Sequence, residues 1–324
     1  MKSRVVITQR VHAEVVDLFA GQAEVVMNES AESAWTREEL LARARGAEAL
    51  MVFMPDLIDD DFLAACPRLK IVSAALKGFD NFDVEACTRR GIWFTIVPDL
   101  LTGPTAELGV ALMLGLARNV AAGDAVIRSG AFLGWRPTLY GTDLRGSTVG
   151  IVGFGKVGRA LARMLQGFDC RVIHTDPSDD GVPLDDLLAA SDFILPLLPL
   201  TAATLHLIDA GAIARMKPGA FLINVSRGSV VDEEAVADAL DRGHLAGYAA
   251  DTFEMEDWAR PDRPRSISPR LLRMKAKTLF TPHLGSAVAR VRLEIELSAA
   301  SNILAALLGK RPPGAINRIA GFAD

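Results

Sequence analysis

The chain alternates short β-rich runs with helical patterns almost from end to end, and this alternation constrains its fold more than any other feature. Repeated strand–helix units form parallel sheets that are covered by helices on both faces. In the first hundred residues, five apolar runs rich in β-branched residues predict strands, and helical periodicity follows each of the first four. These strands are expected at 5–7, 23–27, 50–53, 69–74 and 92–96.

A second series of strands and helices begins at Thr148. A long apolar helix, expected over 105–122, and an irregular arm up to Leu144 separate it from the first series. A final helix, expected over 288–308, would return to the first series, so two crossings would join two domains around a cleft. We therefore predict an α/β protein of two doubly wound parallel-sheet domains, Rossmann-like or flavodoxin-like. Their expected bounds are 1–100 plus 289–324 for one domain and 101–288 for the other.

Composition and charge exclude several classes of protein. Half of the 324 residues are hydrophobic and the net charge is −5, which argues against a nucleic-acid surface but not against a small anionic ligand. The polar N-terminus and the lack of an apolar run of about 18 residues predict a cytoplasmic protein without membrane contact. The three cysteines form no CxxC pair, so we expect buried, reduced thiols and no metal site.

The stretch 153–158, Gly-Phe-Gly-Lys-Val-Gly, has GxGxxG spacing, directly after the first strand of the second series and at the start of a helix. Such glycines permit a tight turn and let the backbone approach a pyrophosphate, whose charge the helix N-terminus favours. Asp176 ends the next strand, close to the expected spacing of about 20 residues, and can accept hydrogen bonds from a ribose. Its carboxylate would repel a 2′-phosphate, which predicts NAD rather than NADP. The alternative is a glycine-rich turn without a ligand.

Three polar residues follow late strands of the second series, at the sheet edge where ligands bind in α/β proteins: Arg227, Glu256 and His283. A histidine suits proton transfer near neutral pH, and a neighbouring carboxylate would favour its imidazolium form. The arginine offers a fork that matches an oxyanion. Taken without their neighbours, these residues could equally be unrelated surface groups.

The neighbouring stretches 224–228, 251–256 and 281–285 resemble the D-isomer-specific 2-hydroxyacid dehydrogenases, and the resemblance extends over nearly the whole chain. It implies that Arg227 binds the substrate anion, that His283 is the acid–base and that Glu256 orients it. It also implies a homodimer formed through the long apolar helix and the arm. The implied cofactor-binding residues are Gly153, Gly155, Lys156, Val157, Gly158, Asp176, Pro199, Val225, Asp251, His283 and Gly285.

Other stretches depart from the common pattern of that family and resemble its phosphite (phosphonate) dehydrogenases. Within 75–83, Lys77 stands before Gly78 at a position where typical members carry an uncharged residue. This resemblance implies oxidation of phosphite to phosphate with NAD and water. The remaining stretches that carry it are 53–56, 135–137, 256–260, 285–288 and 291–294.

The charge of phosphite gives Lys77 a physical role. Phosphite near neutral pH is largely a dianion without a carbon skeleton, so charge must supply most of its binding. One unit pair at about 4 Å, with an effective dielectric near 20, contributes on the order of 4 kcal/mol before desolvation. Lys77 and Arg227 would provide two cations, and the backbone near Gly78 would add donors. The alternative for Lys77 is a solvated loop lysine.

Several choices stay open at the level of sequence. His283 either takes a proton from the attacking water or orients the anion. Arg292 and Met54 are further candidates for the substrate site, although Met54 could instead be core. The aromatic residues Trp135, Tyr140 and Trp258 could cover the cleft or could equally pack a dimer interface. The alternative function is a reductase of glyoxylate, hydroxypyruvate or another 2-oxoacid. A more distant alternative is an NAD-sensing interaction protein, which the short tail at 316–324 disfavours.

Overall fold

The computed structural model describes residues 2–97, 99–178 and 180–320. Its internal contacts divide the chain into two compact units. Unit 1 comprises Met1–Leu101, Trp258–Pro261 and Val288–Asp324, and unit 2 comprises Thr102–Asp257 and Asp262–Ala287. The sequence did not predict the excursion of Trp258–Pro261 into unit 1.

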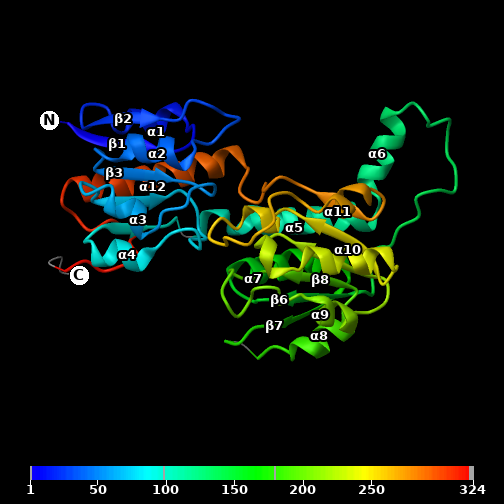
Figure 1. The fold of residues 1–324 in the computed structure, drawn as a ribbon. Helices are drawn as coiled ribbons and strands as arrows, with labels where there is room; N and C mark the ends of the chain where they lie inside the picture. The colour runs from blue at the N-terminus through cyan, green and yellow to red at the C-terminus, as the bar shows by residue number, and fades with distance from the viewer. Residues whose placement is uncertain (1, 98, 179, 321–324) are drawn as a thin grey trace. The chain divides into compact units, whose positions relative to one another are not determined.

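Unit 1 is a five-stranded parallel sheet covered on both faces (Figure 1). Its elements are β1 (Ser3–Ile7), α1 (Ala13–Asp17), β2 (Ala23–Met27), α2 (Arg37–Ala44), β3 (Ala49–Val52), α3 (Asp60–Ala64), β4 (Ile71–Ala74), α4 (Val84–Arg89), β5 (Trp93–Thr95), η1 (Asp99–Leu101) and α12 (Ala289–Leu307). The strand order is β2-β1-β3-β4-β5. Alternation along β1 separates the faces: Val6 packs with α2, α3 and α4, whereas Val5 and Ile7 pack with α1 and α12.

Unit 2 is a six-stranded parallel sheet in the order β11-β10-β9-β8-β6-β7. Its elements are α5 (Thr102–Ala117), α6 (Val120–Arg128), β6 (Thr148–Val152), α7 (Lys156–Met164), η2 (Leu165–Phe168), β7 (Arg171–Thr175), α8 (Leu184–Ala190), β8 (Phe193–Pro196), α9 (Ala210–Arg215), β9 (Ala220–Asn224), η3 (Gly228–Val230), α10 (Glu233–Asp241), β10 (Leu245–Ala250), η4 (Glu254–Glu256), α11 (Pro269–Arg273) and β11 (Thr278–Phe280). The predicted fold of two parallel α/β units is confirmed.

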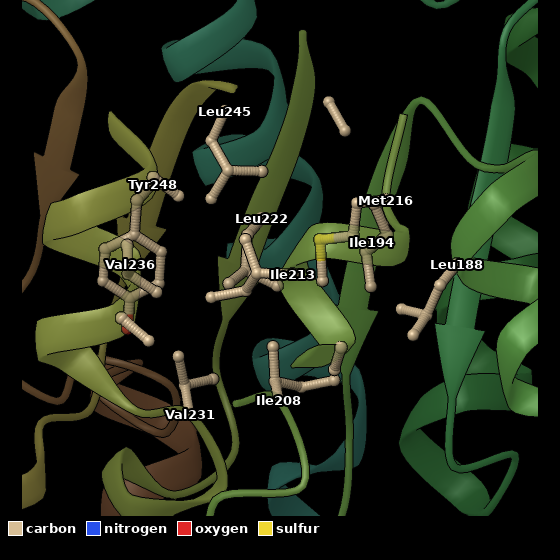
Figure 2. Close-up of a cluster of buried hydrophobic side chains, with 14 of the residues drawn as sticks. Leu188, Ile194, Ile208, Ile213, Met216, Leu222, Val231, Val236, Leu245 and Tyr248 are labelled. Carbon is tan, nitrogen blue, oxygen red and sulfur yellow. The ribbon is translucent and has the colours of Figure 1, made fainter. Parts of the chain in front are cut away.

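The core of unit 2 fixes the strands that carry the site. Figure 2 shows Ile194, Leu222 and Tyr248, from the neighbouring strands β8, β9 and β10, with Ile213 of α9 and Val236 of α10. All five side chains are at most 2% exposed. Because interiors of this kind are close-packed, the carboxyl ends of these strands have little freedom to shift.

The predicted single helix over 105–122 is wrong. The structure ends α5 at Ala117 and begins α6 at Val120, because Asn119 between them adopts a left-handed backbone with φ of 54°. A left-handed residue interrupts the hydrogen-bond ladder of a right-handed helix, and asparagine tolerates that conformation better than most residues. Helix α6 then occupies part of the predicted irregular arm, which is left with residues 129–143.

Contrary to the expectation from sequence, the helical stretch Asp99–Ala117 is long and apolar enough to cross a membrane, with a mean hydropathy of 1.5 over an 18-residue window. Its buried side chains, among them Leu112, Met113 and Leu116, pack with Leu161 of α7 and with the sheet of unit 2. This packing accounts for the apolar face that α5 turns to the sheet, and 33% of the 18-residue apolar window is buried inside the structure.

The cysteines are free, and two of the three are buried as expected. Burial raises the pKa of the Cys87 thiol to about 12 and that of Cys66 to about 11, which keeps both as unreactive thiols. Cys170 differs from the expectation because it is only half-buried.

Candidate active site

The three predicted catalytic residues follow three neighbouring strands of unit 2. Arg227 comes after β9, Glu256 ends the turn η4 after β10, and His283 comes after β11. These strands are adjacent and parallel, so their carboxyl ends meet at one edge of the sheet. That edge is where α/β proteins of this topology bind ligands.

His283 and Glu256 form a hydrogen-bonded pair. The Nδ1 atom of His283 lies 2.7 Å from Oε2 of Glu256, and both side chains are about three-quarters buried. The other carboxylate oxygen of Glu256 accepts a hydrogen bond from the Phe253 amide at 2.8 Å, which fixes the carboxylate. Since Nδ1 is engaged by Glu256, Nε2 is the ring nitrogen that can exchange a proton with a ligand. This geometry is compatible with an acid–base role for His283, which stays a prediction.

Asp251 anchors the loop that carries His283. Its carboxylate accepts hydrogen bonds from the Thr281 hydroxyl at 2.5 Å, the Leu284 amide at 2.7 Å and the Gly285 amide at 2.9 Å. His283 itself has a left-handed backbone, with φ of 55°, and its amide donates to the Asp251 carbonyl. Such a conformation persists only where its surroundings hold it. Burial raises the pKa of Asp251. Its implied cofactor contact stays a prediction, and the anchoring role is one that sequence reasoning missed.

The loop of Arg227 is packed directly against the turn of Glu256. A Cβ at Gly228 would lie 1.9 Å from the Phe253 carbonyl carbon, so only glycine permits this contact of η3 with η4. The buried Asp257 carboxylate adds a second link by accepting from the Ser229 amide at 2.7 Å. Arg227 and Glu256 therefore stand on two loops that cannot move independently over more than a small distance.

The glycine-rich loop has the geometry that a dinucleotide needs. Gly153 has φ of 96°, and a Cβ there would lie 2.7 Å from the Leu197 carbonyl oxygen. A Cβ at Gly158 would lie 2.6 Å from the Gly153 oxygen, whereas Gly155, which caps α7, has open space beside it. Tight packing at the first and third glycines with an open second glycine fits the approach of a pyrophosphate. The residues present thus fit NAD.

Asp176 follows β7 and is held toward this loop. Its Oδ2 accepts from the Phe154 amide at 2.7 Å, and its Oδ1 accepts from the amide and hydroxyl of Ser178. The Ser178 hydroxyl, followed by the two amides, lowers the pKa of this carboxyl. An ionised carboxylate has about four acceptor positions, and three are used here, so Asp176 can still accept from one ribose hydroxyl without losing a present bond.

The other predicted cofactor residues lie around the same sheet edge. Lys156 and Val157 form the first turn of α7, Pro199 follows β8, and Val225 follows β9. Gly285 is buried beneath Thr105, whose hydroxyl donates to the Gly285 carbonyl at 3.4 Å. Their positions are compatible with a bound dinucleotide, and their contacts with it stay predictions.

In unit 1, Lys77 lies in the loop after β4, and its side chain is 46% exposed. Its Nζ lies 3.6 Å from Oδ1 of Asp99, a neighbour that was not predicted from sequence. The following Gly78 is half-buried. Lys77 thus stands at the carboxyl edge of the unit 1 sheet, where a loop can meet a ligand, but it has an acidic partner there.

Met54 and Arg292 also lie in unit 1. Met54 is half-buried and packs against a hydrophobic cluster, so its alternative assignment as core is supported. The guanidinium of Arg292 lies over the Phe53 ring at 5.7 Å and 3.7 Å from Glu296. Burial lowers the pKa of Arg292.

Two buried polar side chains that sequence reasoning missed hold the Met54 loop. The Asp56 carboxylate accepts from the Thr8 hydroxyl at 2.5 Å and from the Phe53 amide at 2.7 Å. Asn81 donates to the Met54 carbonyl at 2.9 Å and accepts from Ala259 at 3.3 Å. One feature of the sequence could have indicated Asp56: it is a charged residue close after an apolar strand. A charged residue that is buried there must find hydrogen-bond partners.

The aromatic candidates are exposed. Trp135 and Tyr140 lie on the arm and are 77% and 78% exposed, and Trp258 is 40% exposed. Tyr140 borders an open hollow of about 600 Å³ at the amino ends of β6 and β8, the sheet edge opposite His283. Neither the substrate role of these residues nor the dimer role is tested by this placement.

The described part of the chain contains no group of three or more His, Cys, Asp or Glu side chains that could hold a metal ion.

Comparison with known proteins gives the class that this fold and site define. Residues 110–285 match the family model described as "D-isomer specific 2-hydroxyacid dehydrogenase, NAD binding domain". Glyoxylate reductase from Thermococcus onnurineus is 35% identical over 333 residues, covering 98% of this chain and 97% of that protein. This chain therefore belongs to the D-isomer specific 2-hydroxyacid dehydrogenase family and is an NAD-dependent oxidoreductase.

Solved structures agree over the full length. The TT0316 protein from Thermus thermophilus has a TM-score of 0.87 at 34% identity, covering 97% of this chain and 100% of that one. An NADPH-dependent glyoxylate/hydroxypyruvate reductase from Sinorhizobium meliloti, in complex with NADP and malonate, has a TM-score of 0.79 at 28% identity, covering 94% and 93%.

Proposed function

We propose that this enzyme oxidises phosphite to phosphate with NAD, using His283, Glu256 and Arg227 as its catalytic group. The observation that carries the reaction class is the 2.7 Å pair of His283 and Glu256 at the carboxyl edge of a dinucleotide-binding sheet. Lys77 and the stretches around it support phosphite as the substrate. Relatives named glyoxylate reductase support a different substrate, which is the second candidate.

In the proposed reaction, each residue of the site has a separate role. NAD, held by the 153–158 loop and Asp176, supplies the hydride acceptor when bound. Arg227 binds oxygens of the anion through its guanidinium fork. His283 takes a proton from water as the water oxygen bonds to phosphorus and the P–H bond breaks, and Glu256 stabilises the imidazolium that results. Phosphite and water thus give phosphate, one hydride and one proton.

In this proposal, Lys77 is the residue that makes the site bind a dianion such as phosphite in preference to a singly charged carboxylate. A carboxylate needs one strong cation, and Arg227 supplies it. Phosphite carries a second charge, for which Lys77 is the proposed partner, in competition with Asp99 at 3.6 Å. An amine that exchanges one acidic partner for a dianion gains in Coulomb energy, because the attraction grows with the charge of the partner.

The second candidate is reduction of a 2-oxoacid such as glyoxylate. It is favoured by the curated relatives named glyoxylate reductase at 35–37% identity. The same residues would serve: Arg227 would bind the carboxylate, and His283 would protonate the carbonyl oxygen as it becomes a hydroxyl. Lys77 would then have no required role in catalysis.

Assays in both directions decide between the candidates. The purified enzyme should form NADH from NAD with phosphite, and kcat/KM for phosphite should fall about 100-fold in Lys77→Met because one charge pair is lost. NAD affinity should not change. Lys70→Met, which removes an exposed lysine paired with Glu48, is the matched control and should behave as the wild type. Turnover of 2-oxoacids alone would overturn phosphite oxidation in favour of the second candidate.

The preference for NAD over NADP rests on Asp176. Its carboxylate, held at the end of β7, would repel a 2′-phosphate. The wild type should show a lower KM for NAD than for NADP, and Asp176→Ser should reduce the difference by about 10-fold or more. Equal KM values in the wild type would contradict this role.

A further inference from the structure

A second group of side chains, two buried carboxylates and a partly exposed histidine, lies next to the turn of Glu256. Glu254, the first residue of η4, and Glu233, the first residue of α10, are 7% and 3% exposed. Each carboxylate accepts a hydrogen bond from the other residue's amide: the Glu254 amide donates to Glu233 at 2.8 Å and the Glu233 amide donates to Glu254 at 3.1 Å. Nε2 of His206 lies 2.8 Å from the second carboxylate oxygen of Glu254.

This group ties the catalytic turn to two other segments. The reciprocal bonds fasten η4 to the N-terminus of α10, a helix whose body is packed into the core shown in Figure 2. His206 links η4 to η3, because its amide donates to the Ser229 carbonyl at 2.7 Å. Three segments therefore meet at Glu254: the loop of Arg227, the turn of Glu256 and the start of α10.

Glu254 and Glu256 belong to the same short turn but have different partners. Glu254 contacts the buried Glu233 and His206, whereas Glu256 contacts His283. A three-residue turn gives little room to shift one end without the other. A displacement of Glu254 would thus move the Glu256 carboxylate relative to His283.

The charges around Glu254 bear on whether the two buried carboxylates can stay in contact. Burial, with further contributions from the charges of Glu254 and Glu256, raises the pKa of Glu233 to about 7. The buried Tyr248 phenol of β10 also faces these carboxylates, and burial raises its pKa well above its ordinary value. A proton retained by Glu233 near neutral pH relieves the repulsion that two buried carboxylates would otherwise have. The pair can then stay in contact through its backbone bonds.

We propose that Glu254, clamped by the Glu233 backbone and by His206, is a positioning residue that holds Glu256 against His283. The proposal rests on the proposed acid–base role of His283. It assigns Glu254 no contact with substrate or cofactor. Its effect on the reaction passes entirely through the Glu256–His283 hydrogen bond.

Two readouts test this role. In Glu254→Leu, kcat should fall about 10–100-fold, because a displacement of about 1 Å at a catalytic group has a cost of that order. The downfield proton signal of the His283–Glu256 hydrogen bond, measured by NMR and assigned with Glu256→Gln, should disappear. Glu254→Gln should retain the signal and most of the activity, since its amide oxygen still accepts from Glu233. Glu234→Leu, at the exposed neighbouring position of α10, is the matched control and should change neither readout.

A double-mutant cycle separates positioning from a merely structural role. If Glu254 acts through Glu256, adding Glu254→Leu to Glu256→Gln should lower kcat by less than about 2-fold, because residues in one network are not additive. If Glu254→Leu does not fold, His206→Leu removes one partner from a partly exposed position and should weaken the same signal. An intact signal in either folded variant, or fully additive losses in the cycle, would overturn the proposal. The NMR readout needs no substrate, so a failure of phosphite as substrate would not be mistaken for a failure of this inference.

Discussion

Buried carboxylates hold the backbone of the loops that carry the proposed site residues. Asp251 anchors the His283 loop, Asp257 anchors η3, and Asp56 anchors the Met54 loop. Sequence motifs predicted Arg227 and His283 as site residues because their side-chain chemistry matches a ligand. They did not predict the anchoring carboxylates. Asp251 was singled out, but for a different role. An anchoring carboxylate can be recognised only once the structure shows which distant amides donate to it.

Asp56 gives a prediction for the pH dependence of stability. Burial raises its pKa from 3.8 to about 6, so the folded protein keeps this proton to a higher pH than the unfolded chain does. The contribution of Asp56 to the free energy of unfolding should therefore fall by about 3 kcal/mol as the pH rises from about 4 to about 6. Asp56→Asn, which can still accept from Thr8 and Phe53, should remove that part of the slope in urea unfolding.

The control for Asp56 is Asp61→Asn, at an exposed position of α3. It should leave the pH slope of the wild type unchanged. An Asp56→Asn protein whose stability falls with pH as steeply as that of the wild type would show that Asp56 does not titrate in this range.

At the scale of elements, the contact of η3 with η4 requires a glycine. In Gly228→Ala the added Cβ would lie 1.9 Å from the Phe253 carbonyl carbon and 2.1 Å from the Glu254 nitrogen, both backbone atoms that cannot rotate away. We expect the free energy of unfolding to fall by at least about 3 kcal/mol and kcat to fall with it. Thermal melting and steady-state kinetics measure the two effects.

Gly167→Ala is the comparison for this substitution, because no atom lies within 4 Å of the added Cβ there. Its stability should stay within about 0.5 kcal/mol of the wild type. Equal melting temperatures for Gly228→Ala and the wild type would refute the close packing of the two loops.

The elements also show where prediction from sequence ends. The two parallel sheets follow from strand and helix periodicity, which is local and needs no knowledge of distant contacts. The break at Asn119 was missed because apolar periodicity continues across it, and only the left-handed backbone of one residue interrupts the helix. The passage of Trp258–Pro261 into unit 1 was missed because it depends on long-range contacts such as that of Ala259 with Asn81.

At the scale of the whole molecule, we propose a homodimer that covers α6 and the arm. Large apolar side chains are exposed there, among them Ile127 at 57%, Leu133 at 84% and Trp135 at 77%. Several large apolar side chains exposed along one segment are what an interface would cover. Light scattering after size-exclusion chromatography should give the mass of two chains, and the double variant Leu133→Ser/Trp135→Ser should shift it toward one chain. A monomeric wild type would contradict the proposal.

The most direct test of the central claim follows the hydrogen of the P–H bond. Phosphite deuterated on phosphorus is incubated with the enzyme and unlabelled NAD, and the reduced cofactor is analysed by mass spectrometry while phosphorus NMR follows the product. We predict that each phosphate formed is matched by one NADH that carries one deuterium, because the hydride leaves phosphorus directly. Reduced cofactor without the label, or no phosphate from phosphite while glyoxylate is reduced, would contradict the account.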